Sequence, residues 1–301
     1  MFRTAYKKTL VVPGLLESRA KLSKGRAPIL AAWLRNAKES SVTEDFYTVV
    51  LQQFGYPSGY YHLAQLRAIA DGLDPQRYWV CADPLHLAVD VAHIYSLGNA
   101  YLNLSMIDVM NVVESINELF DKSLRVVATH PLRWYLELTE AWQFSSVSPQ
   151  QLLGKTLVDK MPKGNDSLRI KRLFNEIQML LYSHEVNQAR REQQQPTLDG
   201  LWFWGVGESL EPLAACPWDG VISDDPIVCQ LARLNNVDLL TSTDKLRGNI
   251  LEVDVRYQFQ DTVDINYNDF GRNQLATVDR LFIGNGLVYD RRSWWSRLCQ
   301  H

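Results

Sequence analysis

The sequence predicts an α/β protein built on a mostly parallel open sheet flanked by helices, and three observations support this fold class. Amphipathic helical patterns alternate with short apolar, strand-like runs through most of the 301 residues. Hydrophobic residues make up 46% of the chain, which suffices for one large core or for a core with a smaller inserted lobe. The four cysteines are widely spaced and form no CxxC pair, so we expect neither a disulfide nor a zinc framework. We therefore expect one α/β domain over residues 1–301, with an inserted α+β lobe at residues 78–149.

The elements of the first half follow from local periodicity. The apolar run Leu10 to Leu16 predicts a first strand, and residues 27–38 gather their apolar side chains on one helical face. A second helix is expected at residues 60–70, ending at Gly72. A polar stretch at residues 145–149 ends the expected lobe. The lobe itself is expected to contain strands at 78–82, 85–91, 125–129 and 134–138 and a helix at 105–120 that begins at its Ser105 cap.

The second half contains the longest predicted helix, which starts at residue 166 and keeps its apolar residues on one face as far as Leu181. Asp225 followed by Pro226 is typical of a helix start. Further strands are expected at 201–204, 220–223 and 250–259. If the sheet is parallel, residues 13–16 and 221–225 should meet at one of its edges.

Charge and hydropathy exclude two classes of partner. The 31 basic and 34 acidic side chains are interspersed and give a formal net charge of −3, so we expect no nucleic-acid partner. No apolar stretch approaches the roughly 20 residues that cross a bilayer, so we expect no membrane partner. Pro13 and Gly14 interrupt the apolar run that follows Lys7 and Lys8, which argues against a signal peptide and for a cytoplasmic location.

A cluster of metal-ligand residue types lies at residues 83–93. Asp83, His86, Asp90 and His93 would align on a helix and could then hold a metal ion. The alternation of apolar and polar residues from Leu85 onward favours a strand, on which His86 and Asp90 share a face. A metal site formed by Asp83, His86 and Asp90 therefore competes with a polar strand edge that lines a cleft.

Two further pairs are candidates for ligand binding. Asp224 and Asp225 follow a predicted strand, where adjacent carboxylates can bind a cation, although helix capping competes for Asp225. Asn187 and Arg190 lie three residues apart, so on a helix they could hold a small anion together by charge-assisted hydrogen bonds. The alternative for Arg190 is an ion pair with a neighbouring glutamate.

Aromatic residues and one histidine complete the candidate set. Trp202 and Trp204 share a strand face, which predicts packing against a helix, and Trp204 is also a ligand-binding candidate. His184 is a weak catalytic candidate, against which stands the commoner role of a core or capping histidine.

Residues 161–207 carry a series of short motifs, formed in order by Pro162 and Gly164, then His184, Val186, Asn187 and Arg190, then Pro196, Trp202, Trp204, Gly205 and Gly207. This series resembles the block of archaeal-type cofactor-independent phosphoglycerate mutases in which a proline–glycine turn leads a helix, an HPVNxxR element and a PAN-x-IWLWGxG strand. Glu185 replaces the proline of that pattern, and residues 197–199 replace its Ala-Asn pair and the residue after it. The segments CADPLHL, RWYLEL and ISDDP also resemble a smaller proteobacterial family of phosphoglycerate-mutase-related, RpfE-type regulatory proteins.

The resemblance implies an alkaline-phosphatase-like core and two metal ions held by Asp and His ligands, with a Ser or Thr as phosphoryl acceptor. It also implies an Asp-Gly pair after the first strand, where this chain has Pro13 and Gly14. It further implies histidine metal ligands late in the chain, although no histidine lies between Glu185 and Gln300. We therefore expect no cofactor, with manganese or zinc as the alternative.

The expected function is that of a non-catalytic, regulatory or ligand-sensing relative, without phosphoglycerate mutase activity even when manganese is added. A small anionic ligand or a protein would be its partner. The alternatives are an active metal-dependent phosphomutase or phosphatase with a rearranged metal site, and a protein-interaction scaffold.

Overall fold

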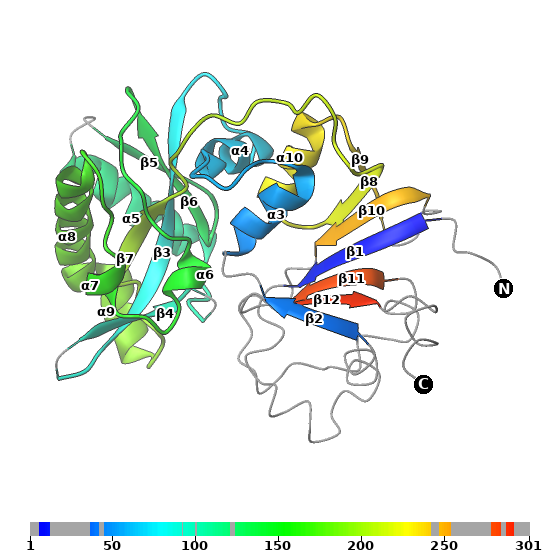
Figure 1. Ribbon diagram of the computed structural model, residues 1–301. Coiled ribbons are helices and arrows are strands. Elements are labelled where there is room, and N and C mark those ends of the chain that lie inside the picture. The colour runs from blue at the N-terminus through cyan, green and yellow to red at the C-terminus, as the bar shows by residue number, and fades with distance from the viewer. Residues whose placement is uncertain are drawn as a thin grey trace. The chain divides into compact units, whose positions relative to one another are not determined.

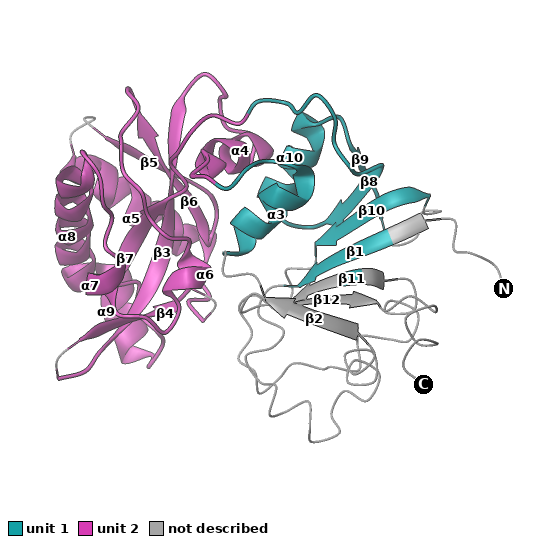
Figure 2. Cartoon of the chain, viewed as in Figure 1, with its two compact units in different colours: residues 1–58, 211–301 teal, residues 59–210 magenta. Residues whose placement is uncertain are grey.

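The computed structural model describes residues 6–12, 37–41, 45–91, 93–99, 101–120, 124–241, 247–253, 278–283 and 287–291. The chain forms two compact units, shown in Figure 2. Unit 1 combines Met1–Ser58 with Glu211–His301, and unit 2 is the continuous segment Gly59–Leu210. The lobe expected at residues 78–149 lies inside unit 2, which extends beyond it on both sides.

The described strands of unit 1 form a seven-stranded sheet in the order β2-β12-β11-β1-β10-β8-β9 (Figure 1). Their bounds are β1 Tyr6–Val12, β2 Ala37–Ser41, β8 Gly220–Ser223, β9 Asp238–Leu239, β10 Gly248–Val253, β11 Val278–Ile283 and β12 Leu287–Arg291. All neighbouring pairs from β11 to β9 run parallel, whereas β12 runs antiparallel to both β11 and β2. The expectation of a mostly parallel sheet is confirmed for this unit.

Two described helices accompany this sheet, α3 at Phe46–Phe54 and α10 at Pro226–Leu234. The sequence did not predict α3, because Thr48, Val49 and Val50 are β-branched and lower its intrinsic helix propensity. Its ends are nevertheless well defined: the Asp45 side chain accepts hydrogen bonds from the first turn, and Gly55 takes the left-handed conformation that ends a helix.

One predicted helix was wrong in part. Residues 37 and 38 of the helix expected at 27–38 belong to β2, because they pair with Arg291 and Asp290 of β12. Residues 27–36 lie outside the described part of the chain, as do 13–16 of the expected first strand and 254–259 of the expected late strand.

Unit 2 is built on an antiparallel sheet in the order β4-β3-β6-β5, with β7 paired to β3. Its strands are β3 Tyr78–Val89, β4 Ile94–Gly98, β5 Arg125–His130, β6 Arg133–Leu138 and β7 Gly200–Trp204. The strands expected at 78–82 and 85–91 form one strand, because β7 pairs with β3 continuously from Cys81 to Leu85. This strand ends at Val89, so residues 90 and 91 of the second expected strand lie outside it. Every residue from Trp79 to Leu85 is buried, so this part of β3 is covered on both faces.

Six described helices belong to unit 2: α4 Leu63–Ala70, α5 Met106–Leu119, α6 Pro149–Leu152, α7 Leu157–Lys160, α8 Ser167–Ser183 and α9 Glu185–Glu192. α4 packs against β3, α5 against β5 and α8 against β7. The predicted Ser105 cap of α5 and the buried apolar face of α8 are both confirmed. None of the described helices combines the length and hydropathy needed to cross a bilayer. The fold is thus mixed α/β, with one mostly parallel and one antiparallel sheet.

Candidate functional site

Asp83 lies in the buried centre of unit 2, on β3, where it forms an ion pair with Arg67 of α4. Arg67 Nη1 and Nη2 donate to the two carboxylate oxygens of Asp83 at 2.8 and 2.6 Å. Trp204 Nε1 on β7 donates to Asp83 Oδ2 at 2.8 Å, and both charged side chains are buried. The carboxylate is therefore fully engaged in holding a helix and two strands together.

The Arg67 guanidinium extends this ion pair into a wider buried network. It lies 4.8 Å from the centre of the Tyr135 ring, and Nε donates to the Tyr135 hydroxyl at 3.1 Å. That hydroxyl donates in turn to Asp71 Oδ2 at 2.6 Å, which also accepts from Arg133 Nε at 2.9 Å. Burial raises the pKa of Asp71, but these hydrogen bonds outweigh burial and leave its pKa below the usual value. Each charged group of the network is paired with another residue of the network, which indicates a structural role.

His86 lies at the margin of the same sheet and is partly exposed. Its Nδ1 lies 2.9 Å from Asp199 Oδ2 and 3.0 Å from the Thr197 carbonyl oxygen, so Nδ1 carries a proton and donates. Leu87 N donates to the same Asp199 oxygen at 2.8 Å. The hydrogen bond to Asp199 raises the pKa of His86, while burial partly opposes this shift. The pair fastens β3 to the segment that precedes β7.

The candidate metal ligands do not converge in space. Asp83 faces Arg67, His86 faces Asp199, and exposed Asp90 accepts a hydrogen bond from His93 N in the turn after β3. Across the described residues, no three His, Cys, Asp or Glu side chains gather into a metal-binding group. Asp83, His86 and Asp90 therefore do not fit a shared manganese or zinc ion.

His184 connects α8 to α9. Its Nδ1 accepts from Val186 N at 3.2 Å, which caps α9, and its Nε2 lies 3.1 Å from the Ser115 hydroxyl of α5. Both ring nitrogens thus contact structural partners, as the capping alternative expects.

Asn187 and Arg190 are buried on α9 and bind backbone groups. The Asn187 amide donates to the Leu198 carbonyl at 2.7 Å and accepts from Leu198 N at 2.9 Å. Arg190 Nε donates to the Pro196 carbonyl at 2.7 Å, and its Nη2 donates to the Leu102 carbonyl. Burial lowers the pKa of Arg190. The two side chains brace the segment that leads into β7, and their anion-binding role stays a prediction.

Asp225 caps α10 at the carboxyl end of β8. Its Oδ1 accepts from Val228 N at 3.0 Å, and its Oδ2 accepts from the Tyr47 hydroxyl at 3.1 Å. Asp224 is exposed beside it. The carboxyl ends of β8 and β1 lie at one edge of the sheet, because both strands run parallel to β10 between them.

The segment of β7 that carries the tryptophans is fixed by packing. Trp202 meets Phe174 of α8 edge-on at 6.4 Å, and Trp204 lies 5.3 Å from the Arg67 guanidinium of α4, so each indole packs against a helix. Beyond β7, a Cβ on Gly207 would lie 2.3 Å from the Tyr60 carbonyl oxygen. Gly207 is thus required by a close backbone approach.

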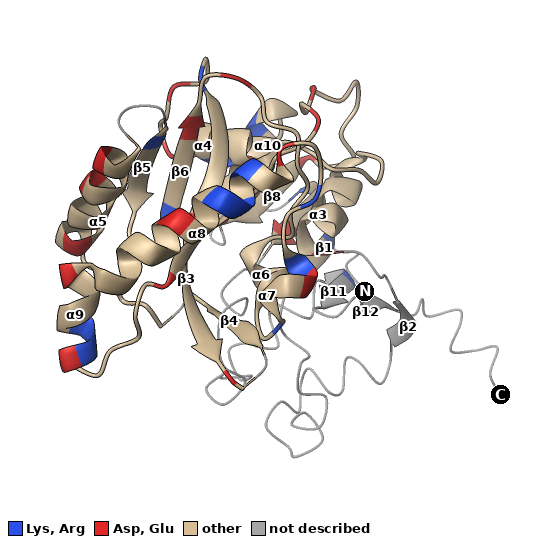
Figure 3. Ribbon diagram, turned by 90° about the vertical axis from the view of Figure 1, so that its left-hand side faces the viewer, with Lys and Arg blue, Asp and Glu red and all other residues tan. Residues whose placement is uncertain are grey.

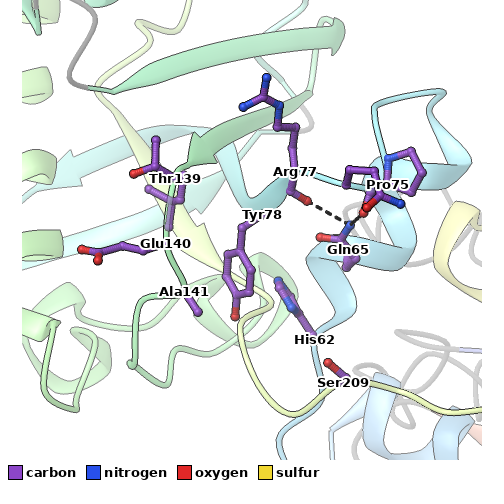
Figure 4. Close-up of a pocket in the computed structure, with 11 residues that line it drawn as sticks. His62, Gln65, Pro75, Arg77, Tyr78, Thr139, Glu140, Ala141 and Ser209 are labelled. Atoms are coloured by element: carbon purple, nitrogen blue, oxygen red, sulfur yellow. Dashed lines mark hydrogen bonds between the residues drawn. The ribbon is translucent and has the colours of Figure 1, made fainter.

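Sequence reasoning missed a pocket of about 510 Å³ in unit 2 (Figure 4). His62 packs on Tyr78 at 4.3 Å and its Nε2 contacts the Trp79 carbonyl at 2.8 Å, while burial lowers the pKa of His62. Gln65 Nε2 donates to the Pro75 and Arg77 carbonyls. Residues far apart in the sequence line this pocket, so no sequence spacing could have predicted it. They are His62, Gln65, residues 75–78, residues 138–141 and Ser209.

No family model matches the chain. A stretch of 63 residues is 29% identical to a probable 2,3-bisphosphoglycerate-independent phosphoglycerate mutase of Geobacter sulfurreducens, and it covers 21% of this chain and 16% of that protein. A cofactor-independent phosphoglycerate mutase from Thermoplasma acidophilum overlays with a TM-score of 0.42 at 12% identity, over 94% of this chain and 88% of that one. The PH0037 protein from Pyrococcus horikoshii overlays with a TM-score of 0.48 at 13% identity, over 96% and 88%.

Proposed function

We propose that this chain is a non-catalytic, regulatory or ligand-sensing relative of the cofactor-independent phosphoglycerate mutases. The motif series at residues 161–207 and the 63-residue match to a probable mutase support the relationship. We further propose that the parallel sheet of unit 1 corresponds to the alkaline-phosphatase-like core and that unit 2 is its inserted lobe.

The engagement of Asp83 is the observation that carries the non-catalytic half of this proposal. A carboxylate whose two oxygens accept from a buried guanidinium is neutralised and cannot serve a metal ion without leaving Arg67 buried and unpaired. The sequence adds Pro13 in place of the implied aspartate and no histidine between Glu185 and Gln300. A two-metal reaction needs several such ligands at once.

Arg190 supports the ligand-sensing half. It uses Nε and Nη2 for backbone carbonyls, so Nη1 is the part of the guanidinium left for a small anion. This anion would stabilise the arrangement of α9 and the segment before β7, which is the coupling that a sensor requires.

Turnover assays with full-length protein test the non-catalytic half. We expect no interconversion of 2- and 3-phosphoglycerate and no phosphatase activity with manganese, magnesium or zinc, and no stoichiometric metal in protein purified without chelator. Metal-dependent turnover that His86→Ala abolishes in protein that still unfolds cooperatively, or that Asp83→Ala abolishes in protein shown to remain folded, would show that a rearranged active site is present.

Calorimetric titration with inorganic phosphate and with 3-phosphoglycerate tests the ligand. Arg190→Lys should weaken binding about tenfold or more, because a lysine cannot keep both carbonyl bonds and the anion contact. Arg191→Lys, on the exposed side of the same helix, is the matched control and should bind as the unaltered protein does. Equal weakening by both changes would contradict a site at Arg190.

A further inference from the structure

The outer face of α8 exposes large apolar side chains. Leu168, Met179 and Tyr182 are exposed to 75%, 75% and 79%, although the opposite face of the helix is packed into unit 2. Figure 3 shows α8 at the front of unit 2, with no element of that unit lying over it. Large apolar residues concentrated on one helix face often mark an interaction surface.

Charge is divided along the same helix. The amino-terminal half carries Arg169, Lys171 and Arg172, against the preference of a helix start for acidic residues. Arg169 forms ion pairs with Asp166 at 3.3 Å and with Glu140 at 3.4 Å. Arg172 and Glu176 lie one turn apart and are both exposed, and within the described residues neither forms an ion pair. Their charges are therefore available to a partner.

The exposed residues form a single stripe whose two ends, Leu168 and Tyr182, lie equally far from Asn175. Leu168, Arg172, Asn175, Met179 and Tyr182 follow one another at intervals of four, three, four and three residues, which keeps them on one helix face. Asn175 is the midpoint of this stripe: Leu168 precedes it by as many residues as Tyr182 follows it.

We propose that this face binds a second copy of the chain, with the two α8 helices antiparallel and related by a twofold axis at Asn175. In this arrangement, a residue that lies a given number of positions before Asn175 in one copy meets the residue that lies the same number of positions after Asn175 in the other copy. Leu168 then lies against Tyr182 of the partner subunit and beside Met179 of the partner subunit. Each apolar end of the stripe is too small to form a binding patch by itself. In the dimer, it packs against the opposite end of the stripe on the other copy.

Electrostatics favour the same arrangement. Arg172 comes within one turn of Glu176 of the partner subunit, and symmetry makes this ion pair twice. The macrodipoles of the two helices oppose each other, so the basic first half of each α8 faces the carboxyl end of the other. The face supplies both members of the Leu168–Tyr182 contact and both members of the Arg172–Glu176 ion pair, which is why a second copy fits it better than an unrelated protein.

The expected dimer is weak. A 17-residue helix is about 25 Å long, and a single helix pair buries less than the roughly 1,000 Å² typical of stable interfaces. We therefore expect a dissociation constant on the order of micromolar to tens of micromolar, with dimer formation that depends on protein concentration.

Sedimentation of the full-length protein over a range of concentrations tests this proposal. Leu168→Glu and Met179→Glu should each weaken association about tenfold or more, whereas Ile107→Glu, at a residue 74% exposed on α5, should leave it unchanged. Glu176→Arg should weaken the dimer, and adding Arg172→Glu to it should restore association because the two charges are exchanged. A protein that stays monomeric at about 100 µM, or a dimer insensitive to these changes, would overturn the proposal.

Cross-linking tests the position of the axis. Asn175→Cys places two thiols opposite each other at the twofold axis, so oxidation should give a disulfide-linked dimer. Asn111→Cys, exposed on α5 and carrying the same native cysteines, is the control. Cross-linking that is no faster for Asn175→Cys than for Asn111→Cys would exclude the antiparallel arrangement.

Discussion

At the residue scale, the buried carboxylate of Asp83 belongs to a residue type that often binds metals or takes part in catalysis, but here it has a structural role. Removing a carboxylate from water is costly unless a cation and hydrogen bonds replace its hydration. Arg67 supplies the cation and Trp204 a further donor. His86 is similarly committed, because Asp199 orients its ring. Side chains that sequence spacing groups together thus have separate partners.

Asp83→Asn should strongly destabilise the protein. The asparagine keeps the shape of the side chain but leaves Arg67 buried without a counter-charge, which should lower the free energy of unfolding by about 3–5 kcal/mol. Urea denaturation measures this loss. Glu118→Gln, at an exposed position of α5, should change stability by less than about 0.5 kcal/mol. A loss below about 1 kcal/mol for Asp83→Asn would mean that Arg67 finds another partner or water.

The His86–Asp199 pair should make stability depend on pH. The folded state raises the pKa of His86 above its usual 6.5, so the pair stabilises fully below about pH 6.5, and this contribution is lost as pH rises through the folded pKa. Asp199→Asn should therefore cost on the order of 1 kcal/mol more at about pH 5.5 than at about pH 9. Urea denaturation at both pH values measures the difference. An equal cost at both would show that His86 is not charged in the pair.

At the element scale, backbone contacts decide the positions of β7 and its neighbours. Asn187 and Arg190 hold the segment before β7. After β7, His62 N donates to the Glu208 carbonyl, and Glu208 N donates to the Tyr60 carbonyl. Two chain segments far apart in sequence, Tyr60–His62 and Gly205–Glu208, are thereby hydrogen-bonded side by side. Gly205 and Gly207, which follow Trp204, thus allow the backbone after β7 to approach the backbone of residues 60–64 closely.

Gly207→Ala should disturb this contact. The added Cβ would lie 2.3 Å from the Tyr60 carbonyl, which the two backbones can relieve only by moving apart. We expect a loss of about 1–3 kcal/mol in unfolding free energy, measured by chemical denaturation. Gly59→Ala is the matched control, since its Cβ would meet only the Tyr61 ring at 3.4 Å. A neutral Gly207→Ala would mean that the segments separate without cost.

At the scale of the whole molecule, each unit has its own sheet. All strand pairs of the antiparallel sheet lie within Gly59–Leu210, and the largest fully buried side chains there include Trp134, Trp202 and Tyr135. A continuous segment with its own core and complete strand pairing meets the physical requirements of an independent domain.

Unit 2 should therefore fold when Gly59–Leu210 is expressed alone, with native-like circular dichroism and a single cooperative unfolding transition. The shorter fragment 78–149, the lobe expected from the sequence, is the control. It lacks Arg67 and β7, so Asp83 would be left without its partners, and we expect it not to fold. A fragment 59–210 that unfolds without cooperativity would show that unit 1 completes its core.

The sequence by itself determined the features that depend on neighbouring residues. The Ser105 and Asp225 caps and the buried stripe of α8 were predictable, because capping and helical periodicity act over a few residues. The alternation of helical and strand-like patterns also predicted the mostly parallel sheet of unit 1. Only the tertiary structure decided the partners of the candidate site residues. Asp199 reaches His86 across 113 residues, and no local pattern encodes that contact. Burial selects such partners, because a polar group withdrawn from water must be paired wherever the fold places its complement.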